Sequence, residues 1–170
     1  LVVMGVLLAM RFVRTLGEVE AANRTLEARV AAREREIAAS YERITVLQRE
    51  QDFYDLTMAY LKRVHEDNVV HVEIFFDPQG HLSRGVSFEV QIKGIHGALK
   101  DAERDFGISF KLIMSFLRHL DEASAFETLA LAKPYLEMID GVGLDSSEVG
   151  HPPVKFENVF RECKALGLLI

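Results

Sequence analysis

The stretch GVGLDSSEVGHPP, residues 141–153, decides which fold this sequence adopts. Its short apolar run ends in a dense polar cluster formed by Asp145, Ser146, Ser147 and Glu148. Two adjacent prolines then mark the entrance to a helix, because proline is favoured in the first helical turn. In parallel α/β folds, ligands are bound at the C-terminal ends of buried strands. The stretch therefore predicts a strand that carries a candidate site at its end.

Further strands are expected on both sides of this stretch. Residues 69–76, VVHVEIFF, are β-branched and aromatic and are followed by the turn sequence DPQG, which predicts a buried strand. Residues 108–117, ISFKLIMSFL, predict a second strand, and residues 139–144 a short third one. Residues 168–170 begin another strand after Gly167.

Helices are expected between these strands. Apolar residues recur at helical spacing in residues 52–65 and in residues 88–106, and Gly107 ends the second of these helices. Asp121 or Ser124 caps the next helix, and the two prolines open a last helix that runs to about residue 166.

Alternating helices and strands favour a parallel sheet with right-handed crossovers. The fold class is therefore α/β, a partial (β/α)8 TIM-type barrel of three to four βα units, preceded by a long N-terminal helix. A closed barrel needs eight strands and about 250 residues. With only 170 residues, this chain is expected to have exposed sheet edges.

Composition limits the possible partners and the compartment. The chain is mildly acidic, with a net charge of −6, which gives no reason to expect a nucleic acid as partner. Cys163 is the only cysteine, so a reducing, cytoplasmic compartment is expected. Residues 1–10 are apolar and precede Arg11 and Arg14, so they belong either to the end of a membrane helix or to an ordinary apolar helix end.

Residue usage divides the chain into two expected domains, 1–51 and 52–170. Every basic residue before position 52 is arginine, and all four prolines lie in the second region. In residues 12–51 apolar residues follow a heptad pattern, with Asn23 at a core position that fixes register in parallel dimers. This pattern predicts a coiled coil and a homodimer. A long solvated helix packed on another element is the alternative.

The stretch EANRTLEARVAAREREIAASYERI resembles the signalling helix of bacterial sensor histidine kinases. In that family such a helix follows a membrane span and leads into the dimerisation helices. The phospho-acceptor histidine motif and the ATP-binding domain do not follow, so the resemblance implies no kinase activity.

Four runs in the second region carry a more specific resemblance. DFYDLTMAYL, NVVHVEIFFDPQ, FLRHL and VGLDSSEVGHPPVKF occur in an order that resembles the bacterial adenosine/adenine deaminase family. The resemblance covers residues 52–169, and it implies a (β/α)8-barrel zinc hydrolase that removes the purine 6-amino group as ammonia. Zn²⁺ in such an enzyme lowers the pKa of a bound water, and a glutamate transfers protons.

The same resemblance implies zinc ligands and a catalytic glutamate that this sequence does not match. The His-x-His pair of the family's first strand has no counterpart, and neither has its His-Ala-Gly-Glu run. The six histidines show no i, i+2 or i, i+4 pairs, the spacing typical of zinc sites. We therefore expect no catalytic residue, metal ligand or cofactor in this chain.

The resemblance places the polar cluster 145–148 against a purine, with Ser146 as the best single candidate for contact. The alternative is that the cluster only caps the following turn and helix. Arg118 and His119 end the neighbouring strand and are expected to support the site structurally. Glu73 on the first strand requires a partner if both sheet faces are covered, because an unpaired buried carboxylate is costly. A Glu73–Arg118 ion pair is therefore expected.

Three interpretations of function follow from the sequence. The first is a truncated purine-deaminase barrel that is inactive alone and contacts adenosine or adenine only along one edge. The second is a dimeric signalling or scaffold protein. The third is an accidental join near residue 51 without selected function.

Overall fold

The computed structural model describes residues 21–23, 25–33 and 46–170. By internal contacts the chain divides into two units, residues 1–46 and 47–170. Residues 21–23 and 25–33 of the first unit are α-helical. The rest of the heptad stretch and the apolar residues 1–10 lie outside the described residues, so the coiled coil, the dimer and the membrane proximity stay predictions. None of the helices in the described ranges combines the length and the apolarity that crossing a membrane requires.

The expectation of one helix through residue 51 is wrong at its C-terminal end. Residues 46–49 are not helical, and α2 (Glu50–Glu66) starts a new helix in the second unit. The Asp52 carboxylate accepts hydrogen bonds from the Arg49 backbone N–H and from the Arg49 guanidinium, both at 2.9 Å. A carboxylate in the first helical turn also interacts favourably with the helix dipole. Asp52 thus fixes where α2 begins.

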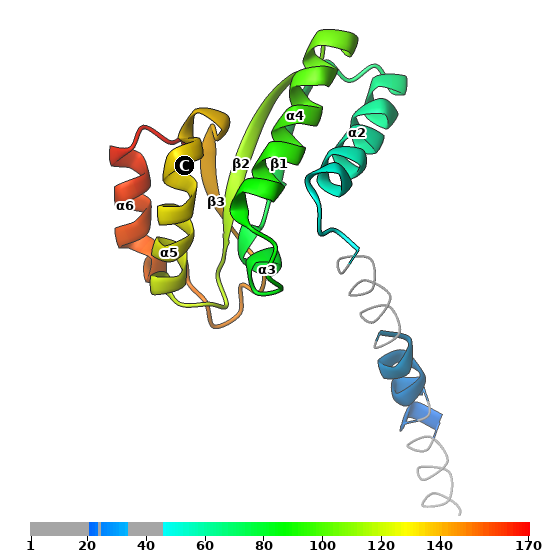
Figure 1. The fold of residues 1–170 in the computed structure, drawn as a ribbon. Helices are drawn as coiled ribbons and strands as arrows, with labels where there is room; N and C mark the ends of the chain where they lie inside the picture. The colour runs from blue at the N-terminus through cyan, green and yellow to red at the C-terminus, as the bar shows by residue number, and fades with distance from the viewer. Residues whose placement is uncertain (1–20, 24, 34–45) are drawn as a thin grey trace, which may run out of the picture. The chain divides into compact units, whose positions relative to one another are not determined.

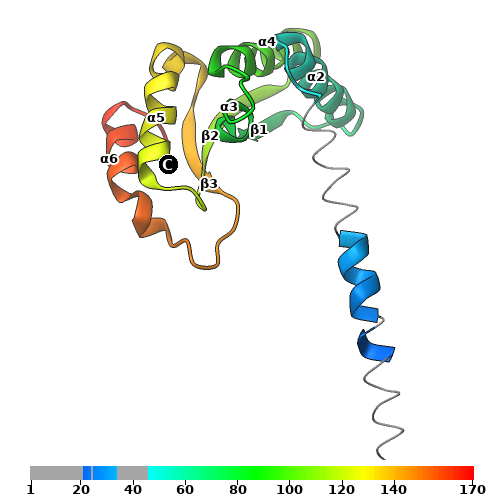
Figure 2. The ribbon, with the colours of Figure 1, turned by 60° about the horizontal axis from the view of Figure 1, so that its bottom comes forward.

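Three parallel strands form the sheet, in the order β1-β2-β3. They are β1 (His71–Phe76), β2 (Ser109–Leu117) and β3 (Gly141–Asp145). In the register of the sheet, Phe76 lies beside Met114 and Leu117 beside Asp145. Leu169 adds a single parallel bridge to Gly141, where the sequence predicts a fourth strand. The partial barrel with parallel strands is confirmed, and Figures 1 and 2 show the helices around the outer side of the curved sheet.

The longest of the helices with described bounds, α4 (Phe88–Phe106), has the bounds that the sequence predicts. The Ser87 hydroxyl caps its N-terminus by accepting from the Val90 N–H, and Gly107 ends it with a φ of +69°. α4 packs against both α2 and the sheet. The contact with α2 is tight at Gly94, where an added Cβ would lie 2.7 Å from the Phe53 Cβ.

The remaining helices follow the strands. The DPQG turn is in fact the start of a short helix, α3 (Pro78–Leu82). Asp121 rather than Ser124 caps α5 (Glu122–Ala132), and it accepts from the Ser124 N–H at 2.8 Å. Two 3-10 segments complete this part of the fold: η1 (Lys133–Met138) follows α5, and η2 (Pro153–Phe156) precedes α6 (Glu157–Ala165).

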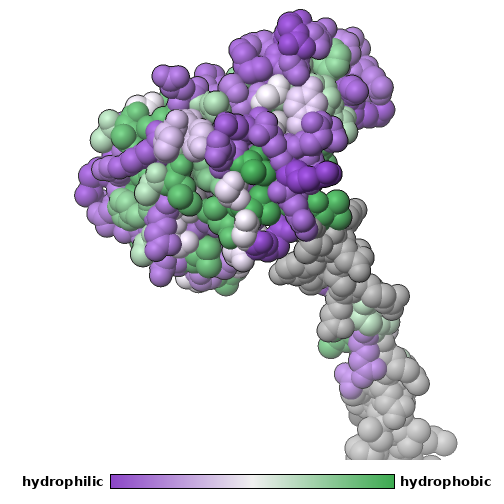
Figure 3. Space-filling view, in the orientation of Figure 1, coloured by the Kyte–Doolittle hydropathy of each residue, from purple (hydrophilic) through white to green (hydrophobic). Residues whose placement is uncertain are grey.

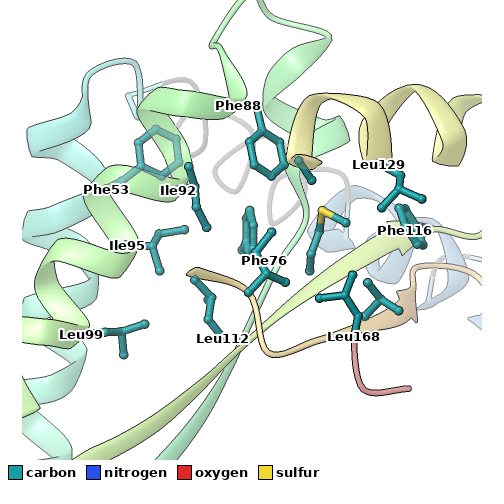
Figure 4. Packing of buried hydrophobic residues seen from close by; sticks show 14 of the residues in the cluster. Phe53, Phe76, Phe88, Ile92, Ile95, Leu99, Leu112, Phe116, Leu129 and Leu168 are labelled. Carbon is teal, nitrogen blue, oxygen red and sulfur yellow. The ribbon is translucent and has the colours of Figure 1, made fainter. Parts of the chain in front are cut away.

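One hydrophobic core fills the space between the sheet and its helices. Figure 4 shows Ile92, Ile95 and Leu99 of α4 facing Phe76 and Leu112 of the sheet. Along β1, successive side chains point to opposite faces of the sheet. One face packs on this core, and the other is exposed and carries His71, Glu73 and Phe75. The exposed side of β1 has no covering layer among the described residues.

Candidate functional site at the carboxyl ends of the strands

The candidate site lies where the three parallel strands end. Asp77 follows β1, Arg118 and His119 follow β2, and the cluster 145–148 starts at the last residue of β3. Because parallel strands end at one edge of a sheet, these side chains gather there. The structure thus brings together all the site residues that the sequence indicates, except Glu73.

Arg118 organises this edge of the sheet. Its guanidinium is nearly buried and donates to the Glu148 carboxylate at 2.8 Å and to the His151 carbonyl at 3.0 Å. Its backbone N–H donates to the Asp145 carbonyl at 2.9 Å. Arg118 therefore fixes the loop that carries the polar cluster, the structural role that the sequence predicts for it.

The expected Glu73–Arg118 ion pair is wrong, because Arg118 pairs with Glu148. Glu73 lies in the middle of β1, opposite Lys111, and its carboxylate is 3.7 Å from the His71 imidazole. Its side chain is 57% exposed. The expectation assumed that both faces of the strand are covered. Since one face is open to solvent, Glu73 needs no buried partner.

Ser146 has a strained backbone and a defined side-chain partner. Its φ is +83°, in the left-handed region that disfavours residues with a Cβ. The Asp145 carboxylate accepts from the Ser146 N–H at 2.6 Å, and the Ser146 hydroxyl lies 2.7 Å from the His119 Nδ1. The hydroxyl is therefore held against His119. The exposed residue Ser147 follows it in the loop.

Asp77 is a functional candidate that the sequence analysis missed. Burial, the nearby Asp145 charge and a hydrogen bond with that carboxyl together raise the pKa of Asp77 to about 6. A carboxyl whose pKa is raised by burial and by a second carboxyl is a recurrent feature of functional sites. Its position is the signal in the sequence: Asp77 directly follows one predicted strand, and Asp145 lies at the end of another. The sequence analysis assigns Asp77 only to the DPQG turn.

Gln79 supports the same edge from α3. Its side-chain oxygen accepts from the Leu117 N–H at 2.7 Å, and its amide donates to the Ser124 hydroxyl at 2.6 Å. This buried glutamine gives β2 a further hydrogen bond beyond the last residue pair of β1 and β2. It thereby holds the end of β2, and hence Arg118, in place.

The described residues do not include a group of three or more His, Cys, Asp or Glu side chains that could hold a metal ion. His65 stacks on Phe106, and His96 contacts the edge of Phe110, far apart in the sequence from the polar cluster. Burial lowers the pKa of His96 and of His81. Cys163 is fully buried, and burial raises the pKa of its thiol to about 11. These residues serve the packing of the fold.

Sequence comparisons identify relatives of this chain. The adenosine deaminase family model matches residues 18–170. An adenine deaminase of Marinomonas sp. (strain MWYL1) is 71% identical over 130 residues, which are 76% of this chain and 39% of that protein. An adenine deaminase of Sphingopyxis alaskensis is 61% identical over 128 residues, 75% of this chain and 38% of that protein. The chain thus spans about two fifths of the length of these curated relatives.

A solved structure agrees with this result. The crystal structure of an adenine deaminase from Arthrobacter aurescens superposes with a TM-score of 0.74 at 46% identity, over 78% of this chain and 40% of that one. The family match also begins well before residue 51, so it includes most of the heptad stretch. The resemblance of that stretch to a signalling helix stays a prediction. From its sequence and its fold, the chain belongs to the adenosine deaminase family.

Proposed function

We propose that this chain forms the part of an adenine deaminase barrel that borders the purine. The observation that carries the proposal is the position of the cluster 145–148. It lies at the carboxyl end of β3, within a sequence closely similar to proteins named adenine deaminases. Adenine is favoured over adenosine as the ligand because the similar curated proteins carry that name. The reaction of such a protein converts adenine and water into hypoxanthine and ammonia.

The proposed roles follow from the contacts in the site. Asp145 offers a carboxylate to the N–H groups of the base, and Ser147 an exposed hydroxyl. Arg118 holds this loop through Glu148, and His119 orients the Ser146 hydroxyl at 2.7 Å. We propose Asp145, Ser146, Ser147 and Glu148 as the purine edge, with Arg118 and His119 as positioning residues.

Zinc does not fit the residues that the structure describes. In the described part of this chain, no carboxylate, imidazole or thiol group gathers into a three-ligand set. No reaction step through a metal is therefore assigned here. We propose that this chain alone neither holds catalytic zinc nor releases ammonia.

Adenine binding tests the proposed edge. In a titration of the ¹⁵N-labelled full chain with adenine, the amide signals of residues 145–148 should shift. Asp145→Asn and Ser147→Ala should each weaken binding about fivefold, because each loses one hydrogen-bonding group toward the base. Val149→Ala is the matched control, since this highly exposed neighbour should leave the affinity unchanged. Unshifted signals at 145–148 in saturating adenine would contradict the proposal.

Ammonia release tests the expected lack of activity separately. The purified chain is incubated with adenine or adenosine and added Zn²⁺, and ammonia is followed over many turnovers. No release above the buffer control is expected. Sustained release that a chelator abolishes would show that the chain assembles a complete catalytic site.

A further inference from the structure

The junction between Asp145 and Ser146 brings a backbone nitrogen close to a side-chain carboxyl. The Asp145 carboxylate accepts a hydrogen bond from the Ser146 N–H at 2.6 Å. Since a carbon–oxygen double bond is about 1.23 Å long, this nitrogen lies at most about 3.8 Å from the Asp145 Cγ. Reacting atoms in near-attack conformers are about 3–3.5 Å apart. The nitrogen and the Cγ are therefore near the separation at which these two atoms close a five-membered ring.

Contacts on both sides of the junction hold this geometry. The Asp145 carbonyl, at the end of β3, accepts from the Arg118 N–H at 2.9 Å. On the other side, the Ser146 hydroxyl lies 2.7 Å from the His119 Nδ1, and the φ of Ser146 is +83°. A residue with a Cβ keeps such a conformation only where its surroundings enforce it. The residues that follow β2 therefore fix the backbone on both sides of the reacting nitrogen.

Asp77 supplies the proton that ring closure requires. When a carboxylate becomes an imide, one of its oxygens leaves as water, and a nearby acid assists this step. Burial, the Asp145 charge and a hydrogen bond with the Asp145 carboxyl raise the pKa of Asp77 to about 6. Asp77 thus keeps a proton at pH values at which an ordinary aspartate, with a pKa of about 3.9, is ionised. The other charged groups at this edge are Arg118 and Glu148, which pair with each other at 2.8 Å, and His119 when it is protonated.

A second junction, Asp140–Gly141, is more reactive by sequence and less reactive by geometry. In a flexible chain an aspartate before glycine closes this ring faster than one before serine, because glycine has no side chain to hinder its nitrogen. In the fold, however, the Asp140 carboxylate accepts from the Lys111 ammonium at 2.6 Å and from the Leu112 N–H at 2.9 Å. Both of its oxygens are thus engaged by β2. Asp140 is therefore an internal reference for the reactivity of Asp145.

We propose that Asp145 is a site of spontaneous isomerisation to isoaspartate. The Ser146 nitrogen attacks the Asp145 Cγ, and one Cγ–O bond breaks. The oxygen that leaves takes up the proton of the nitrogen and the proton of Asp77, and departs as water. One water molecule then opens the succinimide and returns a proton to Asp77: cleavage of the new Cγ–N bond restores aspartate, and cleavage of the original peptide bond gives isoaspartate. This reaction needs neither purine nor metal.

Isomerisation changes the backbone at the end of β3. In isoaspartate the chain passes through Cβ and Cγ, so it gains one carbon atom, and the former Asp145 carbonyl becomes a free carboxylate. Because the Arg118 N–H donates to that carbonyl, residues 146–148 would move relative to Arg118. Figure 3 shows hydrophilic residues over much of the second unit. Asp145 and Ser146 are likewise exposed, so the water that opens the ring is at hand.

Ageing of the full chain tests the proposal. One sample is kept folded at about pH 6 and 37 °C, and a second is kept unfolded in guanidinium chloride at the same pH. Mass spectrometry with electron-transfer fragmentation then distinguishes isoaspartate from aspartate at each position. In the folded chain isoaspartate should form at least about threefold faster at Asp145 than at Asp140, and in the unfolded chain the order should reverse. Faster conversion at Asp140 in the folded chain, or no conversion at Asp145 while the unfolded chain converts, would overturn the proposal.

A pair of variants tests the role of Asp77. Asp77→Asn keeps the shape of the side chain but removes its acidic proton, so it should slow isomerisation at Asp145 in the folded chain about tenfold or more. Glu137→Gln is the matched control, because it removes an exposed carboxylate of η1 and should leave the rate unchanged. In guanidinium chloride both variants should convert at the wild-type rate. Circular dichroism checks that each variant is folded. Equal rates in folded Asp77→Asn and wild type would overturn proton donation by Asp77.

Discussion

The carboxyls of Asp77 and Asp145 lie at the ends of two strands that are separated by β2. Together with burial, Asp145 raises the pKa of Asp77 to about 6. The folded state therefore binds a proton that the unfolded chain, with an ordinary aspartate pKa near 4, has already lost. The stability that this proton contributes is fully present below about pH 4 and is lost as the pH rises through about 6.

Asp77→Asn should change stability in a pH-dependent way. At pH 8 the variant should have an unfolding free energy about 1 kcal/mol higher than wild type, because the partly solvated carboxylate no longer has to be charged in the fold. At pH 4 the two proteins should differ little. Urea unfolding at both pH values measures this, with the exposed Glu137→Gln as control. An equal difference at both pH values would contradict the raised pKa of Asp77.

Asp145→Asn tests how far the Asp145 charge contributes to the pKa of Asp77. Removal of the Asp145 charge should bring the pKa of Asp77 down toward its ordinary range, although burial, the largest cause, remains. The Asp77 carboxyl signal, followed by ¹³C NMR across pH 3–8, reports this change directly. An unchanged midpoint would mean that burial alone sets the pKa.

Ser146 allows a separate prediction about backbone strain. Ser146→Gly should raise the unfolding free energy by about 0.5–1 kcal/mol, because glycine adopts a φ of +83° without a steric cost. Ser146→Ala loses the same hydroxyl contact with His119 but keeps the strain, so it should be no more stable than wild type. Thermal unfolding of the three proteins compares them. A glycine variant no more stable than the alanine variant would contradict strain at this residue.

At the scale of elements, the sequence predicts best those helix and strand bounds that are determined by residues close by in the chain. The bounds of α4 follow from its apolar spacing, the Ser87 cap and Gly107, all of which are readable in the sequence. Where β1 and β3 begin depends on their pairing with the neighbouring strand. Each of these two strands begins two residues later than the sequence predicts. The Glu73 prediction failed for a related reason. Whether a strand face is covered depends on the number of strands, which spacing along the chain does not reveal.

The contact between α2 and α4 gives a matched pair of glycine variants. Gly94→Ala should destabilise the fold by about 2–4 kcal/mol, because its methyl group would collide with the Glu50 carbonyl and with Phe53. Gly97→Ala lies one turn further along α4, where the nearest atom is 3.7 Å away on Tyr54. It should be neutral or stabilise by up to about 1 kcal/mol, because alanine favours helix. Urea unfolding separates the two, and equal effects would contradict close packing at Gly94.

At the scale of the whole molecule, the described core and the candidate site both lie in the second unit. The buried apolar residues of the described chain lie between Phe53 and Leu168. The site residues 77, 118–119 and 145–148 lie within the same range. The family and the partial barrel could be predicted from this region alone. The raised pKa of Asp77 could not be predicted, because it depends on strand ends that are 68 residues apart in the sequence and meet only in the fold.

Residues 47–170 should therefore fold without residues 1–46. The shortened chain should show cooperative thermal unfolding with a midpoint within about 3 °C of the full chain, because no described core residue is removed. Circular dichroism at 222 nm measures this. A fall of about 10 °C or more would show that the first unit stabilises the second.

The strand order also determines how the fold is reached. Every strand pair in the described part of the chain is parallel and joins segments about 30 residues or more apart, as His71 and Ser109 are. These described strands include no hairpin that could start the sheet, so a long loop must close before the first pair forms, which slows folding. Each strand pairs with the next one along the chain. During synthesis, α2, β1 and α4 therefore leave the ribosome before β1 can pair with β2. The sheet then grows in one direction, from β1 toward β3.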